Sequence, residues 1–438
     1  MRRFLPFIAV MAICCAAGLA LSLLASLGRE AGERFTASWR HAVAAASTTK
    51  PHLDGTASKQ SDTLSAARDL GTSQDDVRPV ISHEIVAVVG REVSLYFDGL
   101  VLARDPDEYR FIVEDNGLGG RTTRRWWRLV PAEAQIGVHS IRIAVTDWAG
   151  KELATATTTL RIVAAPPLTE AASILITGSS GTHQSLFPNE LWKLLDAWSP
   201  GKVRFVGTHH PKLNPAVPIF REALPAVWHE GYGGWTWQAF ATYYAMGTEK
   251  PDWVSRSPYV YLEDGRPILD VARYLRDQGV SGRLDAALFE LGINETFAAN
   301  PDDPENLTKS VQATVDWADK LLAAFRAAEP GARLVVMIPA PFTRSDAVFR
   351  RRYVSAAGAS SEFGSAWRHR RIVQALARAM VERLDGQIGT TLVPVHAMFD
   401  AVDGLDANDP GHPNDEGGRE IAAQLFAVLA DVFAQRDR

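Results

Sequence analysis

Cysteine is almost absent from this chain, and its absence excludes several kinds of site. The 438 residues include two cysteines, Cys14 and Cys15, and both lie in an apolar run at the N-terminus. The remainder of the chain therefore has no thiol for a disulfide or for a metal site with cysteine ligands. His209 and His210 have no partner histidine at metal-ligand spacing. We predict a protein without a metal or a cofactor.

A large excess of charge of either sign is also absent. The formal net charge is −5, from 46 Lys and Arg against 51 Asp and Glu, so we expect no nucleic-acid partner. Hydrophobic residues make up 46% and charged residues 22% of the sequence, which is typical of a globular protein. The length allows two domains with flanking segments.

The N-terminus carries a long uncharged run. Arg2 and Arg3 precede residues 4–28, which contain no charge and predict a signal peptide or a membrane-spanning anchor, 1–28. This run exceeds the core of a signal peptide, about 7 to 15 residues, and therefore favours a retained anchor. Small residues near Ser26 and Gly28 leave cleavage open. We expect an extracytoplasmic protein, periplasmic and anchored to the inner membrane or secreted, with no other membrane contact.

Two regions of different composition follow. Residues 29–80 are rich in Ala, Ser, Thr and charge without sustained periodicity, which predicts a flexible linker with a short helix near 35–45. Residues 81–165 contain about seven short strands, a density typical of an immunoglobulin-like β-sandwich. The clearest of these strands are 84–88, 92–97, 109–114, 126–130, 140–146 and 155–163.

The segment 170–438 alternates strands with helices. Strands are predicted near 173–177, 203–206, 285–291, 333–338 and 390–394, and the clearest helices at 307–328, 365–384 and 415–433. Five such strands predict an α/β fold, an open parallel sheet with helices on both faces. Ligands of such sheets bind outside the carboxyl ends of the strands.

One of these strand ends carries a reactive residue type. The apolar run 174–177 stops at Gly178, Ser179, Ser180 and Gly181, and glycines permit a sharp turn and close approach. A helix near 185–197 would direct its N-terminal dipole toward the serine. Gly-Ser loops after strands are common, so this segment alone does not define a catalytic site.

A second loop, 408–414, contains a base and a carboxylate. Asp409 precedes His412 by three residues in a turn-rich segment before a helix. A serine hydroxyl is a poor nucleophile until a base removes its proton, and the base needs a carboxylate to orient it. Ser180, His412 and Asp409 can fill these roles. Considered alone, Asp409 could simply form a turn, and His412 could be a surface or capping histidine.

Two further segments offer hydrogen-bond donors. The strand 288–291 ends in Gly292 followed by Asn294, whose side-chain amide can donate to a developing oxyanion. The glycine-rich loop 228–237 exposes backbone N–H groups around Gly234.

The order of these four segments resembles that of the SGNH hydrolases, also called the GDSL family. The resemblance covers about 173–438 and implies a five-stranded, flavodoxin-like parallel sheet. It implies the roles of nucleophile for Ser180, general base and then acid for His412, and orienting carboxylate for Asp409. The implied oxyanion hole consists of the backbone N–H groups of Ser180 and Gly234 and the side chain of Asn294.

Two positions depart from the family pattern. Ser179 and Glu295 stand where the family usually has aspartate, so the hydrogen bonds that shape these two turns must differ. An ordinary α/β-hydrolase fits less well, because the serine segment lacks the second glycine of Gly-x-Ser-x-Gly.

Aromatic side chains suggest the substrate. Tyr232, Trp235 and Trp237, with His183, are candidates to line a substrate cleft, because aromatic faces stack on sugar rings; the alternative for most of these rings is the core. Residues 247–270 are expected to add a wall to the pocket. We predict a serine esterase that removes acyl, and specifically O-acetyl, groups from an extracytoplasmic carbohydrate. The alternatives are an O-acyltransferase with the same triad and a non-catalytic carbohydrate-binding protein.

Charged clusters elsewhere have simpler interpretations. Asp302, Asp303 and Glu305 are expected to cap the following helix rather than to bind calcium. The arginines at 350–352 are expected to form a solvated face, with contact to an acidic polymer as the alternative.

Overall fold

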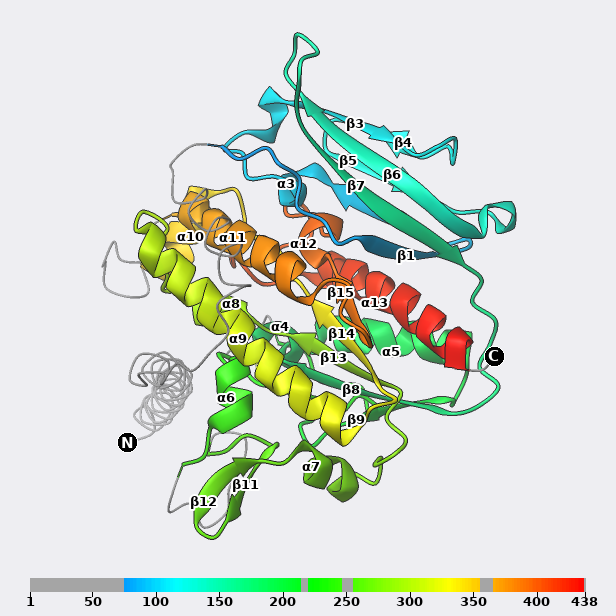
Figure 1. Cartoon of the computed structure of the whole chain (residues 1–438), viewed down its shortest axis with the longest axis vertical. Helices are drawn as coiled ribbons and strands as arrows, with labels where there is room; N and C mark the ends of the chain where they lie inside the picture. Colours follow the sequence, from blue (N-terminus) through cyan, green and yellow to red (C-terminus); the bar gives the residue numbers. More distant parts are fainter. Residues whose placement is uncertain (1–74, 214–219, 246–254, 355–364, 437–438) are drawn as a thin grey trace, which may run out of the picture.

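The computed structural model describes residues 75–213, 220–245, 255–354 and 365–436 (Figure 1). The predicted anchor 1–28 and the helix near 35–45 lie outside these residues. In the part of the chain that is described, no helix is long and apolar enough to span a membrane. The end of the predicted linker is not free, since Asp76 forms a β-bridge with Leu102 and the side chain of Val80 is buried. Residues 75–80 are thus part of the folded structure, and the rest of the predicted linker, 29–74, lies outside the described residues.

A parallel sheet forms the centre of the larger part of the molecule. Its order is β9/β10-β8-β13-β14-β15, where β9 and β10 pair one after the other with the same edge of β8. This order is that of flavodoxin-like folds and confirms the predicted open parallel sheet. The strands are β8 (Ala172–Gly178), β9 (Val203–Val206), β10 (Glu230–Gly231), β13 (Ala286–Glu290), β14 (Arg333–Met337) and β15 (Thr390–Val393). The two-residue strand β10 was not predicted.

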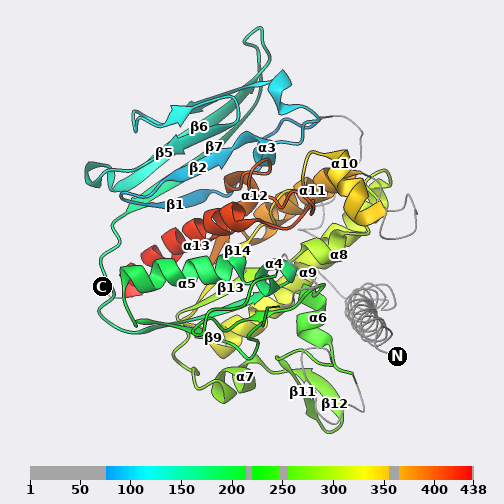
Figure 2. The same ribbon diagram turned by 180° about the vertical axis from the view of Figure 1, so that it is seen from behind.

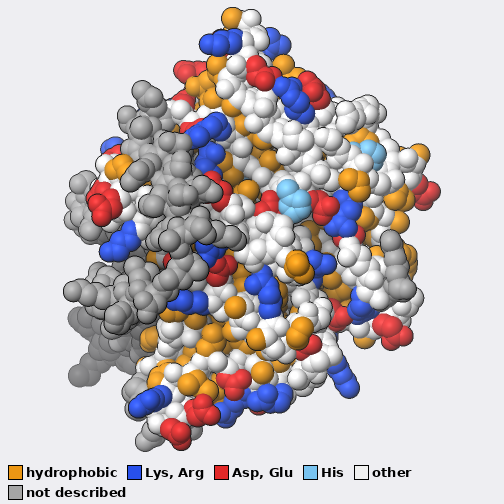
Figure 3. All heavy atoms as spheres, viewed as in Figure 1, with side chains coloured by type: hydrophobic (Ala, Val, Ile, Leu, Met, Phe, Trp, Pro, Cys, Tyr) orange, Lys and Arg blue, Asp and Glu red, His pale blue; other side chains and the backbone are white. Residues whose placement is uncertain are grey.

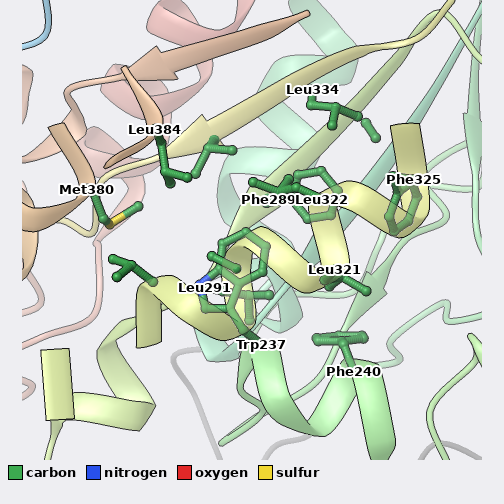
Figure 4. Close-up of a cluster of buried hydrophobic side chains, with 14 of the residues drawn as sticks. Trp237, Phe240, Phe289, Leu291, Leu321, Leu322, Phe325, Leu334, Met380 and Leu384 are labelled. Atoms are coloured by element: carbon green, nitrogen blue, oxygen red, sulfur yellow. The ribbon is translucent and has the colours of Figure 1, made fainter. Parts of the chain in front are cut away.

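Helices cover both faces of this sheet, and adjacent strand residues point to opposite faces. Leu175 faces one apolar cluster, whereas Ile174 and Ile176 face the other. Figure 4 shows the first cluster, in which α9 and α6 pack on the strands. The first face carries α6 (Trp237–Thr242), α7 (Val271–Asp277), α9 (Pro304–Ala328) and α11 (Ala366–Leu384), and the second carries α5 (Leu186–Trp198) and α13 (Asp415–Arg436). The three clearest predicted helices are confirmed as α9, α11 and α13.

The smaller part consists of two sheets that share one core. The sheets have the orders β1-β7-β6-β3 and β2-β5-β4, and β1 pairs parallel with β7 whereas the other pairs are antiparallel. Trp127, Leu95 and Ile143 belong to their common core. All six predicted strands are present; the immunoglobulin-like class and the domain bounds stay predictions. The strands are β1 (Glu84–Val88), β2 (Val93–Tyr96), β3 (Arg110–Glu114), β4 (Arg121–Thr122), β5 (Trp126–Leu129), β6 (Gly137–Thr146) and β7 (Glu152–Val163).

The two parts are packed tightly against each other (Figure 2). The short helix α3 (Phe97–Leu100) lies against α12 (Val395–Met398) so closely that a Cβ atom at Gly99 would be 1.6 Å from the carbonyl oxygen of His396. Ala397 and Met398 of α12 join the core of the smaller part. On the face in Figure 3, Lys and Arg are interspersed with Asp and Glu, which agrees with the small net charge.

Candidate active site

The serine of the Gly-Ser segment lies at the carboxyl edge of the parallel sheet. Strand β8 ends at Gly178, Ser179 is the N-cap residue, and Ser180 begins the one-turn helix α4 (Ser180–His183). Glycine is required at position 178, because a Cβ atom there would lie 1.9 Å from the Thr182 hydroxyl oxygen. The predicted helix near 185–197 is confirmed as α5, which follows α4. The strand end thus presents Ser180, which is half-buried.

The loop 408–414 brings a histidine and a carboxylate to this serine. His412 Nε2 lies 2.9 Å from Ser180 Oγ, and His412 Nδ1 lies 2.8 Å from Asp409 Oδ1. With the imidazole proton on Nδ1, the ring donates to the carboxylate, and its Nε2 can accept from the serine hydroxyl. The structure therefore joins three residues, two of them 232 positions apart, in one hydrogen-bonded chain.

Asp409 is buried but surrounded by donors. Its Oδ1 also accepts from the backbone N–H groups of Gly411 and His412, at 3.1 and 3.2 Å. Burial by itself would raise its pKa, but His412, the Gly411 N–H and the Arg352 guanidinium together hold the pKa of Asp409 well below its usual range. The carboxylate therefore stays ionised at neutral pH.

We expected the arginines at 350–352 to form a solvated face, but two of them contact the loop 408–414. Arg352 Nε lies 3.3 Å from Asp409 Oδ2, and Arg351 donates to the side-chain oxygen of Asn408. Both come from one turn of π-helix, Arg350–Val354. That turn lies beside the loop 408–414 in the folded chain, which the sequence does not reveal.

Glu290, at the end of β13, holds the serine turn. Its Oε2 accepts from the backbone N–H groups of Ser179 and Thr182, at 3.0 and 3.1 Å, and both of their hydroxyls lie within 3.2 Å of it. A Cβ atom at Gly181 would be 3.0 Å from this carboxyl group. Burial raises the pKa of Glu290, although these hydrogen bonds oppose the rise. Ser179 thus donates to a carboxyl group from the adjacent strand.

Glu295, the second departure from the SGNH pattern, is partly buried, and its Oε2 atom is shielded from solvent. Its Oε1 accepts from the backbone N–H of Trp237 at the start of α6. Burial raises the pKa of Glu295 to about 8, despite that bond, and the nearby Glu290 adds to the rise. The side chain therefore ties the asparagine turn to α6 and is largely neutral at pH 7.

A small apolar hollow of about 80 Å³ opens beside Ser180 and His412. Asn294 lines it, and its Nδ2 donates to the carbonyl oxygen of Trp235 at 2.9 Å. The amide carries a second hydrogen, so it can also donate toward the hollow. The apolar lining consists of Phe187, Ile293, Phe297, Met337, Ile338, Pro339, Ala340, Phe342, Val395, Pro413 and Ile421.

Gly234 lies in the loop next to the serine strand. Tyr232 N–H donates to the carbonyl oxygen of Gly178 at 3.0 Å, and Gly234 has a φ of +80°, which favours glycine. Gly234 is buried and is not among the described residues that line the hollow.

The four residues predicted to line a substrate cleft do not line this hollow. Tyr232, Trp235 and Trp237 are 1%, 5% and 0% exposed, and Figure 4 shows Trp237 within the cluster that includes Phe289. His183 accepts from the backbone N–H of Gly233, and burial lowers the pKa of His183 to about 4. The rings of Tyr232, Trp235 and Trp237 thus belong to the core beneath the loop, which is the alternative that the sequence left open for most of them.

Two other expectations have different outcomes. The described part of 247–270 includes the hairpin β11 (Val260–Glu263) and β12 (Arg266–Leu269) and supplies no residue to the hollow, whereas residues 247–254 lie outside the described residues, so the pocket wall stays a prediction. Asp303 caps α9 by accepting from two backbone N–H groups, as expected, whereas Asp302 forms an ion pair with Arg371 instead of a cap. Within the described ranges no group of three or more His, Cys, Asp or Glu residues is arranged to hold a metal ion.

Comparison with known proteins yields distant structural similarities. No family model and no curated protein matches this chain. A carbohydrate esterase family 3 protein from Talaromyces cellulolyticus is 17% identical, with 60% of this chain and 99% of that chain covered and a TM-score of 0.39. A carbohydrate acetylesterase from Sinorhizobium meliloti is 15% identical, with 59% and 99% covered and a TM-score of 0.30. An aryl esterase from M. smegmatis is 13% identical, with 60% and 100% covered and a TM-score of 0.32. These similarities are too distant to establish the activity of this chain.

Sequence reasoning missed two of the side chains that hold the site. Glu290 is a carboxyl group at the end of an otherwise apolar strand, 286–290, and that contrast was a usable signal. Arg352 gave no comparable signal, since it is one of three consecutive arginines and its partner lies 57 residues away.

Proposed function

We propose that this protein is a serine esterase of the SGNH type, which hydrolyses acyl esters through an acyl-enzyme on Ser180. One observation carries the proposal: the chain Ser180–His412–Asp409, with distances of 2.9 and 2.8 Å, lies at the carboxyl edge of a parallel sheet and opens onto a hollow. Nucleophile, base and orienting carboxylate are then within hydrogen-bonding reach of one another.

The first half of the reaction follows from this geometry. Ser180 Oγ attacks the carbonyl carbon of the ester while its proton passes to His412 Nε2, and the ionised Asp409 stabilises the imidazolium. The backbone N–H of Ser180 and the side-chain amide of Asn294, with the backbone N–H of Gly234, are the proposed donors to the oxyanion. His412 then gives the proton to the leaving alcohol oxygen, and the acyl group stays on Ser180.

Water completes the cycle. His412 removes a proton from a water molecule, the resulting hydroxide attacks the acyl carbonyl, and Ser180 leaves with the proton returned by His412. The same intermediate could pass its acyl group to a sugar hydroxyl, so a transferase differs only in the acceptor.

The proposed substrate is an O-acetyl ester of an extracytoplasmic carbohydrate. The hollow of about 80 Å³ beside Ser180 is apolar and small, which suits a short acyl group. The location outside the cytoplasm rests on the uncharged N-terminal run 4–28.

The first test compares hydrolysis of an aryl acetate by the full chain and by its Ser180→Ala variant. We expect hydrolysis by the wild type and a loss of at least about 10³-fold in the variant. Equal rates would contradict a serine mechanism. An added saccharide acceptor that captures the acyl group in preference to water would indicate a transferase, and saccharide binding without turnover would indicate a binding protein.

A further inference from the structure

The orienting carboxylate has a second side-chain partner, a guanidinium, that a catalytic triad does not require. Asp409 Oδ1 serves His412 and two backbone N–H groups, whereas Asp409 Oδ2 faces the guanidinium of Arg352 at 3.3 Å. The Asp409 side chain is 4% exposed and that of Arg352 is 39% exposed. The arginine thus reaches from the surface to a nearly buried oxygen that points away from the histidine.

A neighbouring arginine provides a natural comparison. Arg351 comes from the same helical turn and carries the same charge. It donates to the side chain of Asn408, the residue before Asp409, and no contact between Asn408 and His412 is found among the described residues. Arg351 is exposed, as is Asn408. The two arginines therefore differ chiefly in whether their partner is the carboxylate of the hydrogen-bonded chain.

We propose that Arg352 is a positioning residue for the reaction, which acts through Asp409 and makes a four-residue chain Arg352–Asp409–His412–Ser180. The proposal rests on the esterase function proposed above. In the described part of the chain, the charged or titratable groups that face Asp409 are His412, from its own loop, and Arg352, from the turn at 350–354.

Two physical effects follow from this contact. The guanidinium fixes Oδ2, which prevents the carboxylate from rotating and keeps Oδ1 aligned with the imidazole Nδ1–H. Its positive charge also offsets part of the negative charge of Asp409, so the carboxylate attracts the imidazolium less strongly than it would alone. The arginine thus acts on both the orientation and the charge of the Asp409–His412 pair.

The test compares Arg352→Ala, Arg352→Lys and Arg351→Ala in the full chain, with aryl acetate hydrolysis measured as a function of pH. We expect Arg352→Ala to lower kcat/KM at pH 7 about tenfold and to move its acid limb upward by about half a pH unit. Arg352→Lys keeps the positive charge, so its acid limb should stay much closer to that of the wild type. Arg351→Ala should leave the acid limb within about 0.2 pH unit of the wild type. Circular dichroism and the melting temperature control for folding.

A second measurement does not depend on turnover. The protonation of His412 can be followed by NMR in protein labelled at the histidine ring carbon, with His412→Gln to assign its signal. We expect the titration midpoint of this signal to move upward in Arg352→Ala and not in Arg351→Ala.

Each outcome has one meaning. If neither Arg352→Ala nor Arg351→Ala moves the acid limb or the NMR midpoint, the proposal is overturned. It is also overturned if the two variants move them equally, since equal shifts would indicate a general effect of surface charge. A lower melting temperature without a pH shift would reduce Arg352 to a structural contact and would also overturn it. If the wild type hydrolyses no ester, the proposed function fails, and the NMR titration alone still decides whether Arg352 acts on His412.

Discussion

The two turns that carry the reacting groups are each organised by one carboxyl group, but in opposite electrostatic settings. Asp409 faces His412 and Arg352, and its pKa is held well below the usual range. Glu290 accepts from neutral N–H and O–H groups of the serine turn, and burial raises its pKa. A carboxyl group shielded from solvent can therefore remain ionised beside a cation, as Asp409 does, or accept hydrogen bonds that shape a backbone turn, as Glu290 does.

The largest effect should come from removing the charge of Asp409. Asp409→Asn keeps the size of the side chain but removes the charge that fixes the tautomer and stabilises the imidazolium, so we expect kcat to fall about 10³- to 10⁴-fold. Steady-state kinetics with an aryl acetate measure this change. A decrease below tenfold would mean that the Asp409–His412 contact is structural.

A smaller effect is expected at Glu290. Glu290→Gln leaves one acceptor oxygen in place of two for the two backbone N–H groups and two hydroxyls of Ser179 and Thr182, and turns an amide N–H₂ toward the Ser179 hydroxyl. We expect kcat to fall about 10- to 100-fold and the free energy of unfolding to decrease by about 1–3 kcal/mol. Urea unfolding and kinetics are measured together, with the exposed Glu263→Gln as the matched control. Unchanged kcat would show that the serine turn forms without this carboxyl group.

A third carboxyl group, Glu295, should make the unfolding free energy depend on pH. Its pKa in the folded protein is raised to about 8, so the folded state binds a proton that the unfolded state has already lost above about pH 4.5. The contribution of Glu295 to the unfolding free energy should therefore decrease as the pH rises from about 5 to 8, by about 3 kcal/mol, and the difference between the wild type and Glu295→Gln isolates it from other titrating groups. Glu295→Gln lacks this decrease. Melting temperatures of both proteins across that range test the sign; parallel curves would exclude a proton held by Glu295.

The smallest effect is expected at Ser179. Ser179→Ala removes one hydroxyl donor to Glu290 but leaves the backbone N–H groups of Ser179 and Thr182 in place. We expect kcat to fall about two- to fivefold and stability to decrease by about 1 kcal/mol. A loss as large as that of Glu290→Gln would mean that the hydroxyl, and not the backbone, is the contact that holds the turn.

Much of the framework could be predicted from local sequence. Apolar runs such as 174–177 and 334–337 are typical of strands covered on both faces, and helical periodicity located α9 and α11 closely. The serine, asparagine and histidine segments were recognised because each stands at a strand end or before a helix. The two-residue strand β10 was missed because so short an element has no periodicity of its own.

The aromatic loop shows where local reasoning fails. A dense group of rings around Gly234 is compatible with a sugar-binding surface or with a core, and the composition is the same in both cases. Helix α6 turns Trp237 inward against Phe289, and Glu295 anchors the start of that helix. Only the packing of α6 on the sheet distinguishes the two.

Local sequence was enough to predict the parallel α/β framework and to select Ser180, His412 and Asp409 as candidates, because strand periodicity and motif chemistry are local properties. The tertiary structure decided which other side chains complete the site. Glu290 meets the serine turn because β13 lies beside β8, and Arg352 meets Asp409 because two distant loops lie side by side. Hydrogen bonds and ion pairs act over a few ångströms of space, so contacts of this kind depend on the folded path of the chain and leave no periodic pattern in the sequence.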